Sequence, residues 1–340
     1  MFASLLVVAL IGAIAWAGSA IGLSYLFGVV LPYVAVVTFF LGVIWCMVYW
    51  AKSPVPFSIP TTGGQEKSLD FIKHEKWDCP NTKFGVVVRM FLEVCFFRSL
   101  FRNTAADVRE FDPVTKGPRT IYYSSKWLWF FALLFHYCFL LVFIRHFRFF
   151  MDPVPGWLTF MESIDGIMQI GAPRFFWTGG LLLVAVLFLL ARRLFNQRLR
   201  YISLMNDYFP LFLILGVVLS GICMRYFDKT DIAQVKVFIM GLVHFSPVAP
   251  DGISPLFFMH LAFVSVLLLY FPFSKLMHMP GVFFSPTRNL PTNTREVRHV
   301  NPWNPPKQYF TYAEYEDVYR DAMAEAGLPL EKQPSSKAAE

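Results

Sequence analysis

The chain contains 340 residues, of which 56% are hydrophobic, 18% are aromatic and only 16% are charged. Soluble domains have about 45–50% apolar and about 25% charged residues, so this composition argues against one and indicates a polytopic membrane protein. The net charge of +7 is concentrated in particular loops, so we interpret it as membrane orientation rather than nucleic-acid binding. The five cysteines form no C-x-x-C pair, which argues against a zinc ribbon or a ferredoxin-type cluster site.

Six stretches are long and apolar enough to form membrane-spanning helices, which need roughly 20 mostly apolar residues. The first has no basic segment before it, so we expect a retained span rather than a cleaved signal peptide. We predict an all-α fold, a polytopic membrane helical bundle with six transmembrane helices. The expected spans are 3–22, 28–50, 127–150, 174–194, 208–227 and 255–278.

The loops between these spans differ in their basic residues. Segment 51–126 contains twelve Lys or Arg residues and link 192–203 contains four arginines, whereas 151–173 contains none. Because basic residues gather in cytoplasmic loops, we expect the first two segments and the C-terminal tail in the cytoplasm. This predicts a multi-pass protein of the cell inner (cytoplasmic) membrane with both termini cytoplasmic.

We therefore divide the chain into four expected parts. They are an N-terminal transmembrane hairpin over 1–50, a cytoplasmic loop over 51–126, a four-helix core over 127–278 and a cytoplasmic tail over 279–340. Within the loop, residues 85–101 have the pattern of an amphipathic helix, which is typical of a helix lying on the membrane surface.

The tail contains a Pro/Asn-rich stretch at 301–306 and a helix candidate from Thr311 to Ala326. We expect disorder over 331–340. Aromatic residues outside the spans suggest a surface for a partner protein, and packing against the bundle is the alternative. These aromatic residues are Trp77, Trp303, Tyr309, Phe310 and Tyr312.

Two of the spans each carry two histidines, and ionisable residues at membrane depth are rare and usually functional. His136 and His146 lie on the third span, and His260 and His278 lie on the antiparallel sixth. His136 and His146 are ten residues apart, which corresponds to about 15 Å along a helix. His260 and His278 are eighteen residues apart, which corresponds to about 27 Å. Two imidazole nitrogens on one metal ion lie about 4 Å apart, so neither helix can supply both ligands.

The pairs must therefore be crossed between the two spans. We predict that His146 and His260 form an outer metal site and that His136 and His278 form an inner one. Imidazole is a usual axial ligand of haem iron, so we predict a dihaem cytochrome b core with two b haems between antiparallel helices three and six. The unequal separations require tilted helices or a kink, for which Pro272 is the expected place.

Four arginines lie near the expected outer ends of spans three to five, where the positive-inside rule disfavours them. Haem propionates are anions that arginine binds in a bidentate manner, so we predict that Arg145 and Arg148 bind propionates. Extension of these arginines to lipid headgroups is the alternative. The four arginines are Arg145, Arg148, Arg174 and Arg225.

Spacing and motifs resemble two known families. Over about 120–280, the His-x9-His and His-x17-His pattern resembles the gamma subunit of respiratory nitrate reductase, a dihaem quinol-oxidising cytochrome b. The extra N-terminal span and the long first cytoplasmic loop depart from the five-span pattern of that family. Nearly the whole chain is similar to the DsrM family, the cytochrome b subunits of the membrane Dsr (DsrMKJOP) complex of sulfate reducers. The motifs are Lys52–Phe57, Phe97–Thr104, Tyr208–Gly216, Phe271–His278 and Val297–Asn304.

This resemblance implies a membrane subunit of a menaquinol-linked oxidoreductase complex that does not act alone. It implies two haem b groups, a menaquinone/menaquinol site and a cytoplasmic iron–sulfur subunit like DsrK, in dissimilatory sulfate or sulfite reduction. For that quinone site, the candidate contacts near the outer haem are Arg145, Arg225 and Tyr226. Other Dsr subunits, including a multihaem cytochrome c, would complete the complex. Membrane lipid is a further expected contact, and nucleic acid is not.

Three other functions are compatible with these histidines. The chain could be a dihaem cytochrome b subunit of another quinone-linked complex, such as a hydrogenase. It could be a transporter or proton channel with a non-haem histidine relay, although the internal repeats common in transporters are not visible. It could also be a structural anchor for a peripheral enzyme. Stoichiometric haem would exclude the relay.

Overall fold

The computed structural model of the protein describes residues 1–53, 59–60, 64–114, 116–166, 173–248, 252–298 and 309–331. Trp303, the Pro/Asn-rich stretch 301–306 and most of the expected disordered end 331–340 lie outside these residues. Six helices in the described part are long and apolar enough to cross a membrane, which confirms the predicted number of spans. The spans are formed by the following α-helices, four of them together with an adjoining helical turn: α1 (Phe2–Ala20), α2 (Leu31–Ala51), α5 (Lys126–His146), α7 (Trp177–Phe195), α9 (Met205–Cys223) and α11 (Pro255–Tyr270).

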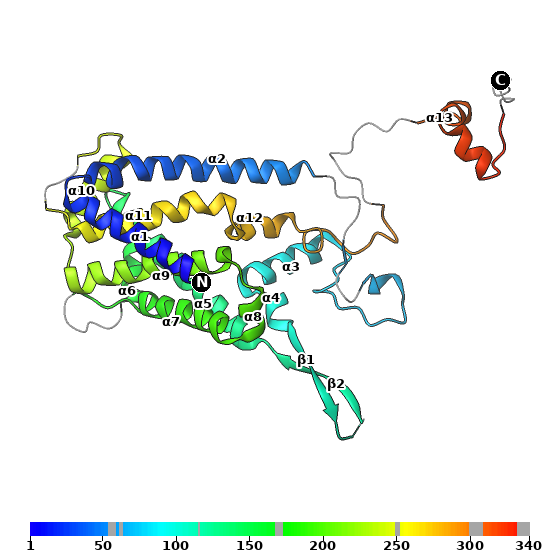
Figure 1. Cartoon of the computed structure of the whole chain (residues 1–340), viewed down its shortest axis with the longest axis horizontal. Helices are drawn as coiled ribbons and strands as arrows, with labels where there is room; N and C mark the ends of the chain where they lie inside the picture. Colours follow the sequence, from blue (N-terminus) through cyan, green and yellow to red (C-terminus); the bar gives the residue numbers. More distant parts are fainter. Residues whose placement is uncertain are drawn as a thin grey trace.

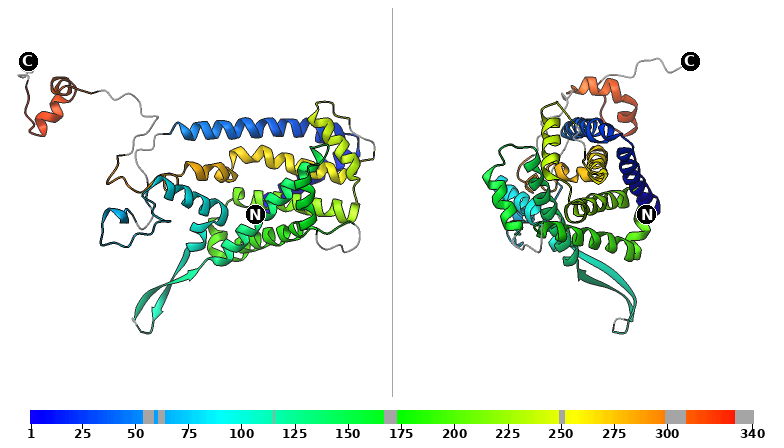
Figure 2. Two further views of the ribbon diagram at one scale, coloured as in Figure 1. Left: turned by 180° about the vertical axis from the view of Figure 1, so that it is seen from behind. Right: turned by 90° about the vertical axis from the view of Figure 1, so that its left-hand side faces the viewer.

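Helix α11 lies in the middle of the bundle, where it packs against α1, α2 and α9 (Figures 1 and 2). Helix α9 also packs against α7, which packs against α5. Large apolar side chains fill these contacts, as in the buried cluster of Tyr208, Leu213 and Phe263. On the opposite sides of α1 and α2, side chains such as Leu6 and Leu41 are exposed, as expected of helices that face lipid.

Shorter elements cover the two ends of the bundle (Figure 1). One end carries α6 (Gly156–Asp165) and α10 (Ile232–Val243). The other carries α3 (Lys83–Phe96), α4 (Arg98–Arg102), α8 (Gln197–Ile202) and α12 (His278–Gly281). We call these the outer and inner ends, following the predicted orientation. The predicted tail helix is confirmed as α13 (Tyr312–Glu325), which Thr311 and Glu314 cap reciprocally.

The sixth span breaks where Pro272 was expected to disturb it. Helix α11 ends at Tyr270 and continues as a 3₁₀ turn over Phe271–Phe273, because proline has no N–H to donate to the helix. Ser274 is extended, and a second 3₁₀ turn over Lys275–Met277 leads into α12. His278 therefore follows a break and does not lie on a helix continuous with His260.

The loop 51–126 contains structure that the sequence did not predict. The expected helix over 85–101 is divided into α3 and α4 by Phe97, which has a left-handed φ of 51°. A β-hairpin of β1 (Thr104–Asp112) and β2 (Gly117–Ser124) then projects from the inner end (Figure 1). Charged residues interrupt its apolar alternation, and two strands alone are only marginally stable in water. An ion pair between Arg198 and Asp107 holds the base of the hairpin to α8.

Helix α2 closely approaches the turn that follows α11, where Gly42 faces Pro272. A Cβ atom at Gly42 would lie 2.6 Å from Cβ and 2.8 Å from Cγ of the rigid proline ring. We therefore expect Gly42→Ala to destabilise the bundle by about 1–3 kcal/mol, the usual cost of overpacking. Thermal unfolding in detergent, followed by circular dichroism, measures this effect.

Gly179 in α7 is the matched control, because a Cβ there would meet nothing within 4 Å. Alanine is favoured over glycine inside a helix by about 1 kcal/mol, so Gly179→Ala is expected to be neutral or stabilising. Equal melting temperatures for Gly42→Ala and the wild type would contradict the close approach.

Candidate functional site

The four span histidines form two pairs across the bundle. The ring centroids of His136 on α5 and His278 at the start of α12 lie 6.0 Å apart, with the ring planes at 86°. The centroids of His146 on α5 and His260 on α11 lie 6.4 Å apart, with nearly parallel planes at 17°. The structure thus brings together the same residues that the helix spacing paired.

Three of the imidazoles are oriented by backbone carbonyl groups of their own segment. Nδ1 of His136 lies 2.7 Å from the carbonyl oxygen of Ala132. Nδ1 of His146 lies 2.6 Å from the carbonyl oxygen of Val142. In His278 the corresponding distance to Lys275 is 2.8 Å. Because a carbonyl oxygen only accepts, Nδ1 is the protonated nitrogen in each ring.

His260 is oriented instead by a neighbouring helix. Its Nδ1 lies 2.9 Å from Oγ of Ser220 on α9. The serine hydroxyl donates to the carbonyl oxygen of Gly216 at 2.7 Å, so it is an acceptor for the imidazole N–H. The adjacent Gly221 leaves room for the ring, since a Cβ there would lie 3.3 Å from Cε1 of His260. Ser220 lies 40 positions before His260 and outside any of the motifs, so no local sequence signal identifies it as a partner of the imidazole.

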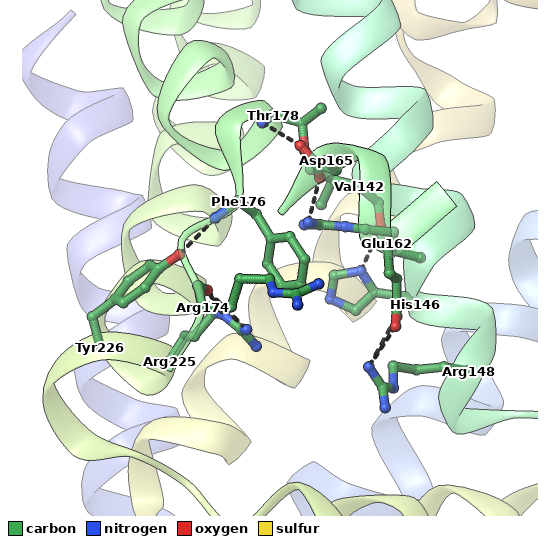
Figure 3. Close-up of polar contacts among 11 residues, drawn as sticks. Val142, His146, Arg148, Glu162, Asp165, Arg174, Phe176, Thr178, Arg225 and Tyr226 are labelled. Atoms are coloured by element: carbon green, nitrogen blue, oxygen red, sulfur yellow. Dashed lines mark hydrogen bonds and ion pairs between the residues drawn. The ribbon is translucent and has the colours of Figure 1, made fainter. Parts of the chain in front are cut away.

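Beside the outer pair, Arg145 forms a buried ion pair with Asp165 at the end of α6. Nη1 of Arg145 and Oδ2 of Asp165 are 2.5 Å apart, and their side chains are 13% and 9% exposed. The backbone N–H and the hydroxyl of Thr178 also donate to Asp165, at 2.9 Å and 2.6 Å. Asp165 therefore receives hydrogen bonds from both α5 and α7 (Figure 3).

Arg148 is paired in a similar way but nearer the surface. Its Nη1 donates to both carboxylate oxygens of Glu162, each at 2.9 Å, and the arginine side chain is 38% exposed. The carboxylates of Glu162 and Asp165 thus balance the arginines for which the sequence suggested propionates. The loop 151–173 contains acidic residues but no Lys or Arg, and it follows Arg145 and Arg148 closely in the sequence. This pattern was the signal that could have identified Glu162 and Asp165 as the partners of the two arginines.

Phe176 brings together the other predicted residues of this region (Figure 3). The Cζ atoms of Arg145 and Arg225 lie 3.9 Å and 4.2 Å from its ring centroid, which suits cation–π contacts. Its backbone N–H donates to the hydroxyl of Tyr226 at 3.2 Å. Arg225 also donates to the backbone carbonyl oxygen of Arg174 at 3.0 Å. Arg174 thus joins the predicted arginine cluster through its backbone.

Comparison with known proteins identifies the family and several relatives of this chain. Residues 94–299 match the nitrate reductase gamma subunit family. The chain is 47% identical over 288 residues to the Hdr-like menaquinol oxidoreductase cytochrome b-like subunit of Archaeoglobus fulgidus, covering 82% of this chain and 84% of the relative. The protein of that name from Archaeoglobus profundus is 41% identical, covering 81% and 82%.

A more distant relative is the respiratory nitrate reductase 1 gamma chain of Escherichia coli, which is 29% identical over 160 residues, covering 44% of this chain and 69% of the relative. The matched range 94–299 contains all four paired histidines and four of the six spans. Six apolar helices together with these relatives indicate a multi-pass membrane protein. The chain belongs to the nitrate reductase gamma subunit family.

Proposed function

We propose that this protein is a dihaem cytochrome b subunit of a menaquinol-linked membrane oxidoreductase complex. Its two histidine pairs would hold the haems, His136 with His278 towards the inner end and His146 with His260 towards the outer end. When bound, the haems would supply one-electron transfer between menaquinol and a partner subunit. The protein supplies the ligands, their orientation and the buried surroundings.

The spacing within each pair carries this proposal. By analogy with zinc, an iron between two imidazoles lies about 2 Å from each ligating nitrogen. Each nitrogen lies about 1 Å from the centroid of its own ring. Two imidazoles that share one iron should therefore have ring centroids about 6 Å apart. The observed distances are 6.0 Å and 6.4 Å. Since Nδ1 of every ring is hydrogen-bonded, Nε2 is the nitrogen left to bind iron.

A reduced-minus-oxidised spectrum and a pyridine haemochrome assay of the purified protein test this proposal. We expect about two b haems per chain, in line with one per imidazole pair. A protein purified from haem-replete cells without haem would contradict the proposal and favour a proton relay through the histidines.

The outer arginines have two proposed roles. Arg145 and Arg148 would reach haem propionates only by sharing or exchanging Asp165 and Glu162, their present carboxylate partners. Arg145, Arg225 and Tyr226 meet around Phe176 beside His146, so they are our candidates for quinone contacts. Replacing Tyr226 with phenylalanine tests the second role through the rate at which a menaquinol analogue reduces the cytochrome.

The finer assignment rests on the motifs shared with the DsrM family and on the names of the archaeal relatives, which are Hdr-like menaquinol oxidoreductase subunits. It comprises an iron–sulfur partner like DsrK, companion subunits including a multihaem cytochrome c and a role in sulfate or sulfite reduction. The proposal of cytoplasmic termini rests instead on the basic residues of the loops. Affinity purification from the native host under mild detergent, followed by mass spectrometry, identifies the companion subunits. A hydrogenase among them would favour the alternative complex.

The hydrogen bond from His260 to Ser220 gives a specific prediction. Ser220→Ala removes the hydroxyl that accepts from the buried imidazole of His260, and a typical hydrogen bond of this kind contributes about 0.5–1.5 kcal/mol. We expect weaker retention or a shifted midpoint potential of one haem, measured by haem content and redox titration. Ser265→Ala is the control, because Ser265 is buried on α11 but bonds to the carbonyl oxygen of Leu261. Identical behaviour of both variants would contradict the role of Ser220.

A further inference from the structure

The corner between α3 and α4 lies against the inner histidine pair. Phe97, whose φ of 51° makes this corner, places its ring edge-on to His136, with centroids 5.0 Å apart and planes at 87°. A side chain in van der Waals contact with an imidazole limits the rotation of that ring about χ2. Phe97 therefore restricts His136 from outside the span that carries it.

Two hydrogen bonds fasten the end of α3 to α5 on both sides of His136. Nε1 of Trp129 donates to the carbonyl oxygen of Phe96 at 2.7 Å. The hydroxyl of Tyr137 donates to the carbonyl oxygen of Cys95 at 2.9 Å. The last carbonyl groups of a helix have no partner within that helix, so these donors satisfy acceptors that α3 leaves open. The corner is thus held at a defined height along α5.

The middle of α3 is fastened to the segment that follows His278. Arg89 is 5% exposed, and its Nη1 donates to the carbonyl oxygen of Thr287 at 2.7 Å. Burial lowers the pKa of the Arg89 guanidinium below its usual value, but arginine stays charged in proteins. Glu93, one turn further along α3, forms an ion pair with Arg288 at 3.1 Å. Helix α3 is therefore attached both to α5, which carries His136, and to the segment at Thr287 and Arg288 that follows α12.

This double attachment matters because His278 follows the break in the sixth span. The extended Ser274 and the turn over Lys275–Met277 separate it from α11, and α12 has only four residues. The register of a continuous helix therefore does not set the height and rotation of His278. The contacts of α3 with Thr287 and Arg288 supply an external support.

We propose that α3 and the Phe97 corner are a positioning element that sets the orientation of His136 relative to His278. The inference rests on the proposed function, in which this pair holds the inner haem. Neither Phe97 nor Arg89 would bind iron, and both would act through the ligands. The outer pair has a different support, Ser220, so changes in α3 should alter one haem and leave the other unchanged.

Three variants each remove one contact of α3. Phe97→Leu removes the ring edge at His136, Tyr137→Phe removes a single hydroxyl, and Arg89→Met removes the attachment to Thr287. Phe149→Leu is the matched control, because Phe149 lies beside the outer His146 with centroids 6.0 Å apart. Each protein is purified in its complex, and its haem content, redox titration and low-temperature EPR spectrum are compared with those of the wild type.

We expect a threefold to tenfold change in the redox equilibrium constant of one haem in the three α3 variants, where tenfold corresponds to about 59 mV for one electron. The same haem should change its EPR anisotropy, because the angle between the imidazole planes splits the iron d orbitals. Phe149→Leu should affect the other haem. If Phe97→Leu does not accumulate, Tyr137→Phe makes the same test with a smaller change.

The possible failures are distinguishable. A wild-type complex with two haems whose potentials and EPR signals are unchanged in all three α3 variants would overturn the positioning role alone. Equal shifts of both haems would also overturn it, since they would indicate general loosening of the bundle. A wild-type complex without haem would overturn the proposed function and this inference with it.

Discussion

Replacing His136 with alanine is expected to remove the inner haem and keep the outer one, and replacing His260 should do the reverse. Each variant should therefore contain about half the wild-type haem, because one imidazole is a poor substitute for a bis-histidine site. Pyridine haemochrome quantification of the purified proteins measures the loss. His244→Ala is the control, since His244 follows α10 and belongs to neither pair.

The EPR spectrum identifies which haem remains. The inner imidazole planes are nearly perpendicular at 86°, whereas the outer planes are nearly parallel at 17°. Perpendicular planes leave the two iron π-type d orbitals nearly degenerate and give a strongly anisotropic ferric signal, whereas parallel planes split them and give a rhombic one. We expect only the rhombic signal in His136→Ala. Retention of both signals in that variant would contradict the crossed pairing.

Replacing Asp165 with asparagine is expected to destabilise the outer end strongly. The variant leaves the guanidinium of Arg145 buried, at 13% exposure, without its carboxylate partner. Breaking one side of a buried ion pair typically costs about 3–5 kcal/mol, because the remaining charge is uncompensated. Thermal unfolding in detergent, followed by haem absorbance and circular dichroism, should show a clear fall in melting temperature.

Glu162→Gln is the matched control for this effect. Its partner Arg148 is 38% exposed, and exposed ion pairs typically contribute about 0–1 kcal/mol. The double variant Asp165→Asn with Arg145→Met should recover part of the lost stability, since it removes the unpaired charge as well. Equal small shifts for Asp165→Asn and Glu162→Gln would show that Arg145 is not buried as described.

Several features of the site and fold could not be predicted from the sequence, and two of them depend on contacts between residues far apart in the chain. Asp165 and Ser220 both lie in segments without a motif, and only the folded bundle brings them to Arg145 and His260. The division of the predicted helix 85–101 at Phe97 was missed because its apolar pattern continues across the corner. The hairpin over Thr104–Ser124 was missed because its strands alternate too weakly in polarity.

The sequence by itself determined the number of spans, the break near Pro272 and the pairing of histidines between the third and sixth spans. These properties depend on apolar length, on the chemistry of proline and on the fixed rise of a helix. Only the tertiary structure decided the ring angles, the carboxylate partners of the arginines and the contacts of α3 with α5 and with the segment that follows α12. Those features depend on how the helices rotate and pack against one another, and hydropathy along a chain does not encode that rotation.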